Sequence, residues 1–105
     1  MAFDIKTVNQ TVSNYVTDVK NTMPIDRVFL FGSYAKGVAD NGSDIDLCFF
    51  SHEFENKSSV DVISLLLGLT RKYRGFYIEP HVFPTSELQN DNPFVKEILR
   101  TGIEI

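Results

Sequence analysis

Apolar residues recur with helical spacing in three segments of the chain. The first series predicts a helix that starts near Asp4, ends before Pro24 and packs one face, formed by Ile5, Val8, Val12, Tyr15, Val16 and Val19. The second helical segment begins near a capping-box pattern, formed by Ser58 and Asp61. The helix that follows carries a wide apolar arc and is therefore predicted to be heavily buried; the arc comprises Val60, Val62, Ile63, Leu65, Leu66, Leu67, Leu69 and Tyr73.

The third helix is predicted close to the end of the chain. Asn92 and Pro93 fit its cap and first position, and Gly102 fits its end. Its predicted buried face consists of Phe94, Val95, Ile98 and Leu99.

Three shorter segments predict strands, at residues 27–31, 44–50 and 76–83. Pro80 predicts an edge position or a bulge for the last strand, because proline cannot donate to the ladder. Residues 34–36 fit one turn of helix, and residues 38–43 have the composition of a loop. The order of elements predicts an α+β domain: a small mixed sheet with helices packed on one face and the carboxylate site on the other.

Composition sets limits on this domain. The chain has 105 residues and a net charge of −4, so we expect a single domain over residues 1–105. The acidic balance argues against broad binding to nucleic acid, which depends on Lys and Arg. The single cysteine, Cys48, excludes an internal disulfide and is expected to be a buried thiol. We find no membrane span or signal peptide in the sequence and expect a cytoplasmic protein.

Two carboxylates stand out on the second predicted strand. Asp44 and Asp46 are two residues apart, so both project from the same face. At ~5 Å and an effective dielectric constant of ~20, their repulsion is about 3 kcal/mol. A divalent cation such as Mg²⁺ or Mn²⁺ would relieve it. Taken alone, however, Asp-x-Asp is more often simply an acidic surface.

A glycine and a serine end the first predicted strand. Gly32 permits close approach of the backbone, and N–H groups at a helix start, with the Ser33 hydroxyl, suit phosphate oxygens. Alone, this pair is more often a plain turn. Gly32 and Gly37 have P-loop spacing, but Lys36 lies before the second glycine, so a Walker-type NTPase is disfavoured.

Together, these elements resemble a known family. Gly-Ser-x-Ala-x-Gly at residues 32–37, followed by Ser-Asp-Ile-Asp-Leu at residues 43–47, looks like the DNA polymerase β-type nucleotidyltransferases, and most like the minimal nucleotidyltransferases. The resemblance implies a nucleotidyltransferase fold and transfer of a nucleoside monophosphate from an NTP, with ATP the expected substrate. It assigns Gly32 and Ser33 to the triphosphate, and Asp44 and Asp46 to two Mg²⁺ ions, with Mn²⁺ as an alternative. Lys36 is a further candidate for the nucleotide, as a point charge near phosphate, and so is Ser43.

The family also uses a third carboxylate on a later strand. Here the candidate is Glu79, as metal ligand, as base for the acceptor hydroxyl, or as both. Glutamate departs from the more common aspartate at that place. His81 shares the face of Glu79, but a structural or surface role is favoured for it.

The resemblance also implies a partner. Minimal family members often accompany a HEPN-type toxin, so we expect an antitoxin that modifies a hydroxyl of that protein. Two alternatives stay open: a catalytically inactive module that binds nucleotide or partner, and transfer to a small molecule. Ile103 and Ile105 are predicted to pack either on the core or on another subunit of an oligomer.

Overall fold

The computed structural model describes residues 5–40 and 42–105. Within these residues there are four α-helices: α1 (Ile5–Thr22), α2 (Ser33–Lys36), α3 (Ser59–Gly68) and α4 (Pro93–Thr101). The strands are β1 (Arg27–Phe31), β2 (Ile45–Phe50), β3 (Ile78–Phe83) and β4 (Ile103–Glu104). Three short 3₁₀-helices connect them: η1 (His52–Asn56), η2 (Leu69–Lys72) and η3 (Thr85–Leu88).

The strands form one mixed sheet in the order β3-β2-β1-β4. β1 runs antiparallel to β2 and to β4, whereas β2 and β3 are parallel. The predicted mixed sheet is therefore confirmed. β3 lies at an edge, as Pro80 predicted.

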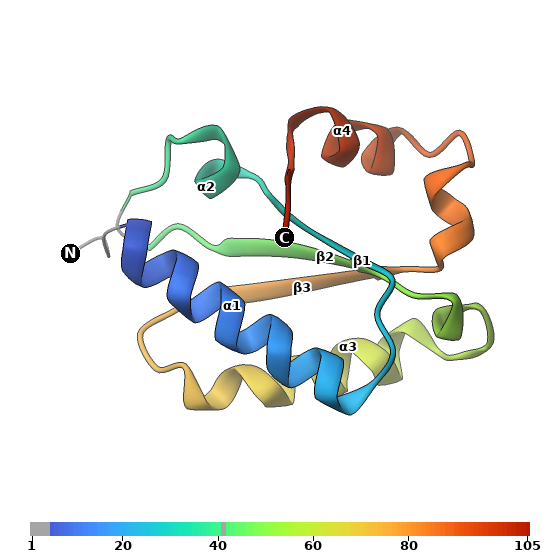
Figure 1. Ribbon diagram of the computed structural model, residues 1–105, viewed down its shortest axis with the longest axis horizontal. Coiled ribbons are helices and arrows are strands. Elements are labelled where there is room, and N and C mark those ends of the chain that lie inside the picture. Colours follow the sequence, from blue (N-terminus) through green and yellow to red (C-terminus); the bar gives the residue numbers. More distant parts are fainter. Residues whose placement is uncertain (1–4, 41) are drawn as a thin grey trace.

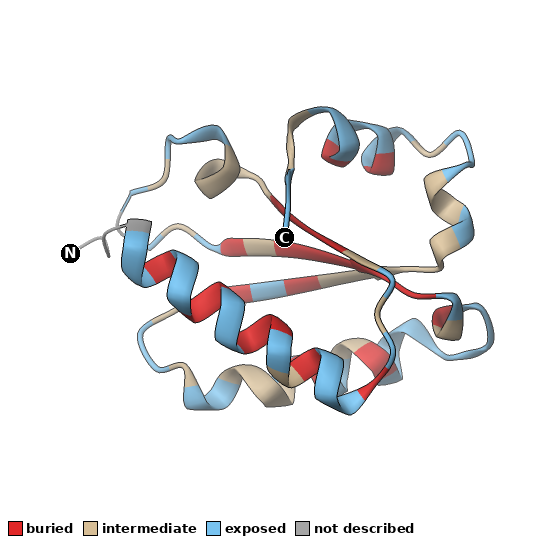
Figure 2. Ribbon diagram, in the orientation of Figure 1, coloured by how far each residue is buried: buried red, intermediate tan, exposed pale blue. Residues whose placement is uncertain are grey.

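One face of the sheet is the main hydrophobic core. Alternation along the strands directs Val28, Leu30, Ile45, Leu47 and Phe49 to this face, where α1 and α3 cover them (Figure 1). The predicted stripe of α1 is buried from Val8 to Val19 and belongs to this core. Figure 2 shows buried and exposed positions alternating along the helix. The predicted cap at Asp4 and the side chain of Ile5 lie outside what the structure describes. A buried hydrogen bond joins the two helices, from the Tyr15 hydroxyl to the Leu66 carbonyl at 2.7 Å.

The opposite face is shared between a smaller core and the carboxylates. Val95 and Ile98 of α4 pack on Phe29, Cys48 and Phe50. The predicted fold class is confirmed, but α4 lies on the face that carries the carboxylates. It does so because its apolar side packs on the apolar residues of that face. The side chain of Asn92 caps α4 by accepting the N–H groups of Phe94 and Val95, as predicted. Phe94 and Leu99, predicted to be buried, are 43% and 38% exposed.

The prediction of a heavily buried α3 was wrong. Only Val62 and Leu66 of this helix are buried, and Val60, Leu65 and Leu67 are 73%, 45% and 45% exposed. Ser58 does occupy the N-cap position, but its side chain makes no capping hydrogen bond. After Gly68 the chain tightens into η2, and Leu69 and Tyr73 pack against the rim of the core.

The sequence analysis also missed β4. This two-residue strand pairs with β1, and Glu104 holds Arg27 through two contacts of 2.7 and 2.8 Å. Ile103 and Ile105 remain 49% and 46% exposed. So short a strand has no alternation to detect.

Asp26 connects the segments that follow β2 and β3 at one end of the sheet. Its carboxylate accepts hydrogen bonds from the Thr85 hydroxyl at 2.5 Å and from the His52 N–H at 2.9 Å, and it pairs with the His52 ring. These bonds lower the pKa of Asp26 to about 2, and the pairing raises the pKa of His52. The carboxylates described next lie toward the other end of the strands. Within residues 5–40 and 42–105, no helix is long and apolar enough to cross a membrane.

Candidate active site

Two carboxylates meet across neighbouring strands. Asp46 of β2 pairs in register with Glu79 of β3, and since paired residues share a face, both side chains point away from the main core. The Asp46 side chain is 21% exposed and that of Glu79 is 53% exposed. Glu79 lies on an edge strand, so an outside molecule can reach it from the side. The structure thus brings together two of the residues that the sequence analysis selected.

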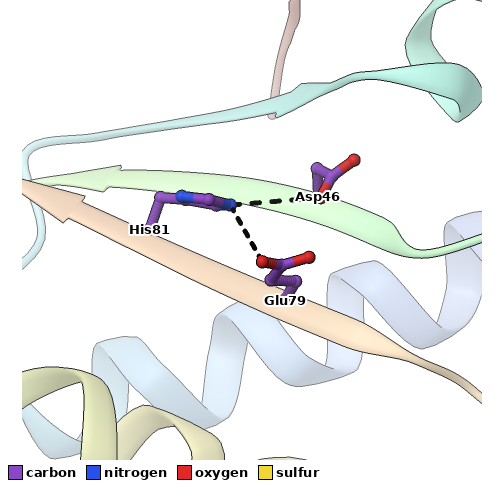
Figure 3. Close-up of side chains that lie close together, drawn as sticks. All are labelled: Asp46, Glu79 and His81. Atoms are coloured by element: carbon purple, nitrogen blue, oxygen red, sulfur yellow. Dashed lines mark ion pairs between the residues drawn. The ribbon is translucent and has the colours of Figure 1, made fainter.

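A histidine completes the group. His81 follows Glu79 on the same face of β3, and its Nε2 atom lies 3.8 Å from Glu79 Oε1 and 4.0 Å from Asp46 Oδ1 (Figure 3). The sequence analysis favoured a structural or surface role for His81. The two-residue spacing from Glu79 was the available signal. Its distance from Asp46, however, depends on the pairing of β2 with β3.

The electrostatics of the group are unfavourable without a cation. Partial burial raises the pKa of Asp46 above its usual range, and the charges of Glu79 and Asp44 raise it further, while His81 acts in the opposite direction. Ligand atoms of Asp46, Glu79 and His81 all lie within 4.8 Å of one another. Two carboxylate oxygens and an imidazole nitrogen are suitable donors for a divalent cation. The residues present therefore fit a metal ion.

Gly32 brings the turn after β1 against Asp46. Its φ of 75° and ψ of −151° belong to a region that only glycine occupies readily. A β-carbon at this position would lie 2.3 Å from Asp46 Oδ2. Any side chain here would therefore displace the carboxylate, which explains why the turn needs glycine next to an aspartate.

The short helix α2 begins directly after this turn. Ser33 opens it, and the Ser33 carbonyl accepts the Val38 N–H at 3.0 Å. Lys36 lies exposed in the last turn, and Gly37 ends the helix in a left-handed conformation. The predicted turn of helix is confirmed, with Gly32 and Ser33 at its start, next to Asp46.

The loop that leads into β2 holds two more predicted residues. The Ser43 hydroxyl accepts the Asp40 N–H at 2.9 Å and donates to the Asp40 carboxylate at 3.0 Å. Asp44 is exposed and comes just before β2 rather than within it. Among the described residues, the group within 4.8 Å does not include Asp44, although its charge acts on Asp46.

Cys48 takes no part in this group. It is fully buried under α4, and burial raises the pKa of its thiol to about 12. A thiol with that pKa is a poor nucleophile at neutral pH. The predicted buried thiol is confirmed.

The chain is similar to known proteins. The model of a family described as a nucleotidyltransferase domain matches residues 12–102. A protein of Methanocaldococcus jannaschii, provisionally named a protein adenylyltransferase, is 28% identical over 102 residues, covering 96% of this chain and 94% of the relative.

Two solved structures are similar in fold. One is a provisionally identified nucleotidyltransferase from Sulfolobus solfataricus, with a TM-score of 0.64 and 19% identity over 90% of this chain and 76% of that one. The other is a chain from a mutant of the toxin–antitoxin MntA-HpeT, with a TM-score of 0.60 and 16% identity over 89% and 70%.

Proposed function

Because the chain belongs to the nucleotidyltransferase domain family, we propose that it transfers AMP from ATP to a hydroxyl group on a partner protein. The observation that carries the proposal is the pairing of Asp46 with Glu79 beside the turn at Gly32. The relative from Methanocaldococcus jannaschii bears the name of a protein adenylyltransferase, which supports a protein acceptor.

Three carboxylates would hold the metal. Asp46 and Glu79 lie close together, and Asp44 directly precedes β2, where its charge acts on Asp46. Mg²⁺ is the cation we propose, and Mn²⁺ also fits oxygen donors. When bound, such an ion supplies positive charge beside phosphate and makes a coordinated hydroxyl more acidic.

The turn at Gly32 would receive the triphosphate. With no side chain at Gly32, phosphate oxygens can come close to the backbone, and the first N–H groups of a helix lack partners within that helix. The Ser33 hydroxyl and the exposed Lys36 add a donor and a positive charge. Ser43, which is hydrogen-bonded to Asp40, would fix the conformation of the loop beside the nucleotide.

Glu79 would take the proton of the acceptor. The acceptor oxygen forms a bond to the α-phosphorus, the bond from that phosphorus to the β-phosphate oxygen breaks, and pyrophosphate leaves. A carboxylate that is 53% exposed on an edge strand can be reached by a hydroxyl on a second protein.

We propose a HEPN-type toxin as that partner, with this chain as its antitoxin. The resemblance of residues 32–47 to the minimal nucleotidyltransferases supports this choice. The likeness in fold to a chain of a toxin–antitoxin is compatible with it.

The experiment is a labelling reaction with α-³²P-labelled ATP, Mg²⁺ and proteins captured from the source cell on the immobilised chain. We expect label on one captured protein with the wild type, and none with the double variant Asp44→Asn/Asp46→Asn. Glu55→Gln, an exposed carboxylate change outside the site, should label like the wild type. Undiminished labelling by the double variant would overturn the proposal. Binding of ATP with no labelling and no pyrophosphate release would instead favour an inactive binding module.

A further inference from the structure

The position of His81 next to the carboxylates has no counterpart in the residues that the family motif assigns. The imidazole comes from the same strand as Glu79 and lies opposite Cys48, two register positions further along the strands than the pair of Asp46 and Glu79. Figure 3 shows its Nε2 edge turned toward both carboxylates, with an ion pair drawn to each.

Aromatic rings hold His81 in this orientation. The Phe31 ring lies with its centroid 5.1 Å from that of the imidazole, and the Phe94 ring lies at 5.7 Å. The His81 side chain is 31% exposed, so it is enclosed on these sides and open toward the carboxylates and solvent. A ring packed against two phenylalanines loses little additional freedom when its nitrogen binds a ligand.

We infer that His81 supplies a nitrogen ligand to the cation held by Asp46 and Glu79, and that this ligand shifts the preference of the site from Mg²⁺ toward Mn²⁺. The inference rests on the proposed function, since it concerns the cation of that same site. It adds a residue that the sequence pattern does not assign to the metal.

The distances allow this coordination. Bonds to a small divalent cation are about 2.0–2.2 Å long, so two ligands of one ion can lie at most about 4.4 Å apart. The separations of 3.8 and 4.0 Å from Nε2 to the two carboxylates fall within that limit. All three ligand atoms lie within 4.8 Å of one another, so the two carboxylates exceed the limit by a few tenths of an ångström at most. His81 could therefore join the ion without moving its strand.

The chemistry of the donors sets the preference. Mg²⁺ favours oxygen ligands and gains little from an imidazole, whereas first-row transition metals accept nitrogen readily. A site made of two carboxylates and one imidazole should therefore bind Mn²⁺ better than a site of carboxylates alone. His81 would then tune which metal supports the reaction.

The test is pulsed electron paramagnetic resonance of Mn²⁺ bound to the untagged, nucleotide-free protein. The chain has only two histidines, so a histidine nitrogen coupled to Mn²⁺ comes from His81 or His52. We expect the coupling in the wild type and in the matched control His52→Leu, and its loss in His81→Leu. Leucine suits the aromatic neighbours, and His81→Gln provides a second variant if leucine fails to fold. Uniform ¹⁵N labelling of the wild type should change the modulation without any substitution.

Binding constants give the second measurement. His81→Leu should weaken Mn²⁺ binding about tenfold or more, and Mg²⁺ binding less than about threefold. Bound Mn²⁺ without nitrogen coupling in the wild type, or coupling that persists in His81→Leu, would overturn the role of His81 but leave the carboxylate site standing. If the folded wild type binds no Mn²⁺ at all, the cation site fails, and with it both this inference and the proposed function.

Discussion

Replacing Asp46 with asparagine should stabilise the metal-free protein while destroying its site. Asp46 is largely enclosed, and its carboxylate lies within 4.8 Å of that of Glu79. Asparagine has nearly the same shape, carries no charge and can donate a hydrogen bond to Glu79. The native fold therefore loses a repulsion and keeps its packing.

The magnitude follows from the geometry. Two unit charges no more than 4.8 Å apart repel by at least about 3.5 kcal/mol at an effective dielectric constant of about 20. Glu79 is 53% exposed, so solvent screens most of this energy and leaves a net effect on the order of 1 kcal/mol. In a domain of this size, that corresponds to a rise in Tm of about 4–8 °C.

The assay is thermal melting in EDTA, followed across pH. The pKa of Asp46 is raised, so its charged form disfavours the native state at pH values above that pKa. The advantage of Asp46→Asn should be complete there, should shrink as the pH falls through the raised pKa, and should vanish well below pH 3.8, where the carboxyl is protonated in both the folded and the unfolded wild type. Asp44→Asn, a change at an exposed carboxylate, should gain less. An Asp46→Asn variant less stable than the wild type in EDTA at neutral pH would refute the reasoning.

Three further changes probe the fold. Gly32→Ala should cost about 1–3 kcal/mol in urea unfolding, because alanine disfavours the backbone angles at this turn; an unchanged midpoint would refute the strain. Tyr15→Phe should cost about 1–3 kcal/mol, because the buried Leu66 carbonyl loses its hydroxyl donor; a loss below the error of the melt would contradict that. The depressed pKa of Asp26 stabilises the native state above pH 3.8, and this stabilisation fades as the pH falls through about 2. In an acid titration, the stability of Asp26→Asn should therefore change less with pH in that window than the stability of the wild type. Identical titration curves for the two proteins would rule out the hydrogen bonds from His52 and Thr85 as the source of this stabilisation.

Periodicity predicted most of the fold because a long element with one buried face has apolar residues at regular spacing along the sequence. α1 and the three longer strands were found in this way. The wide apolar arc of α3 misled the prediction, since hydrophobicity cannot tell a residue that faces the core from one such as Val60 that stays exposed.

The site was predictable only in part. Asp46 could be selected because the motif at residues 32–47 resembles a known family, and Glu79 because it stands on a later strand where that family has a third carboxylate. The proximity of His81 to Asp46 depends on the register of β2 against β3, and the need for glycine at position 32 depends on a contact with Asp46. Both facts belong to tertiary pairing, which local sequence does not contain.

The most direct test of the central claim is the intact mass of the purified partner after incubation with the wild-type chain, ATP and Mg²⁺. The proposed transfer predicts a mass increase of one AMP group per modified hydroxyl, with one pyrophosphate released for each, and neither product with Asp46→Asn or Glu79→Gln. A partner mass unchanged by the wild-type chain, or the same increase with Asp46→Asn, would contradict it.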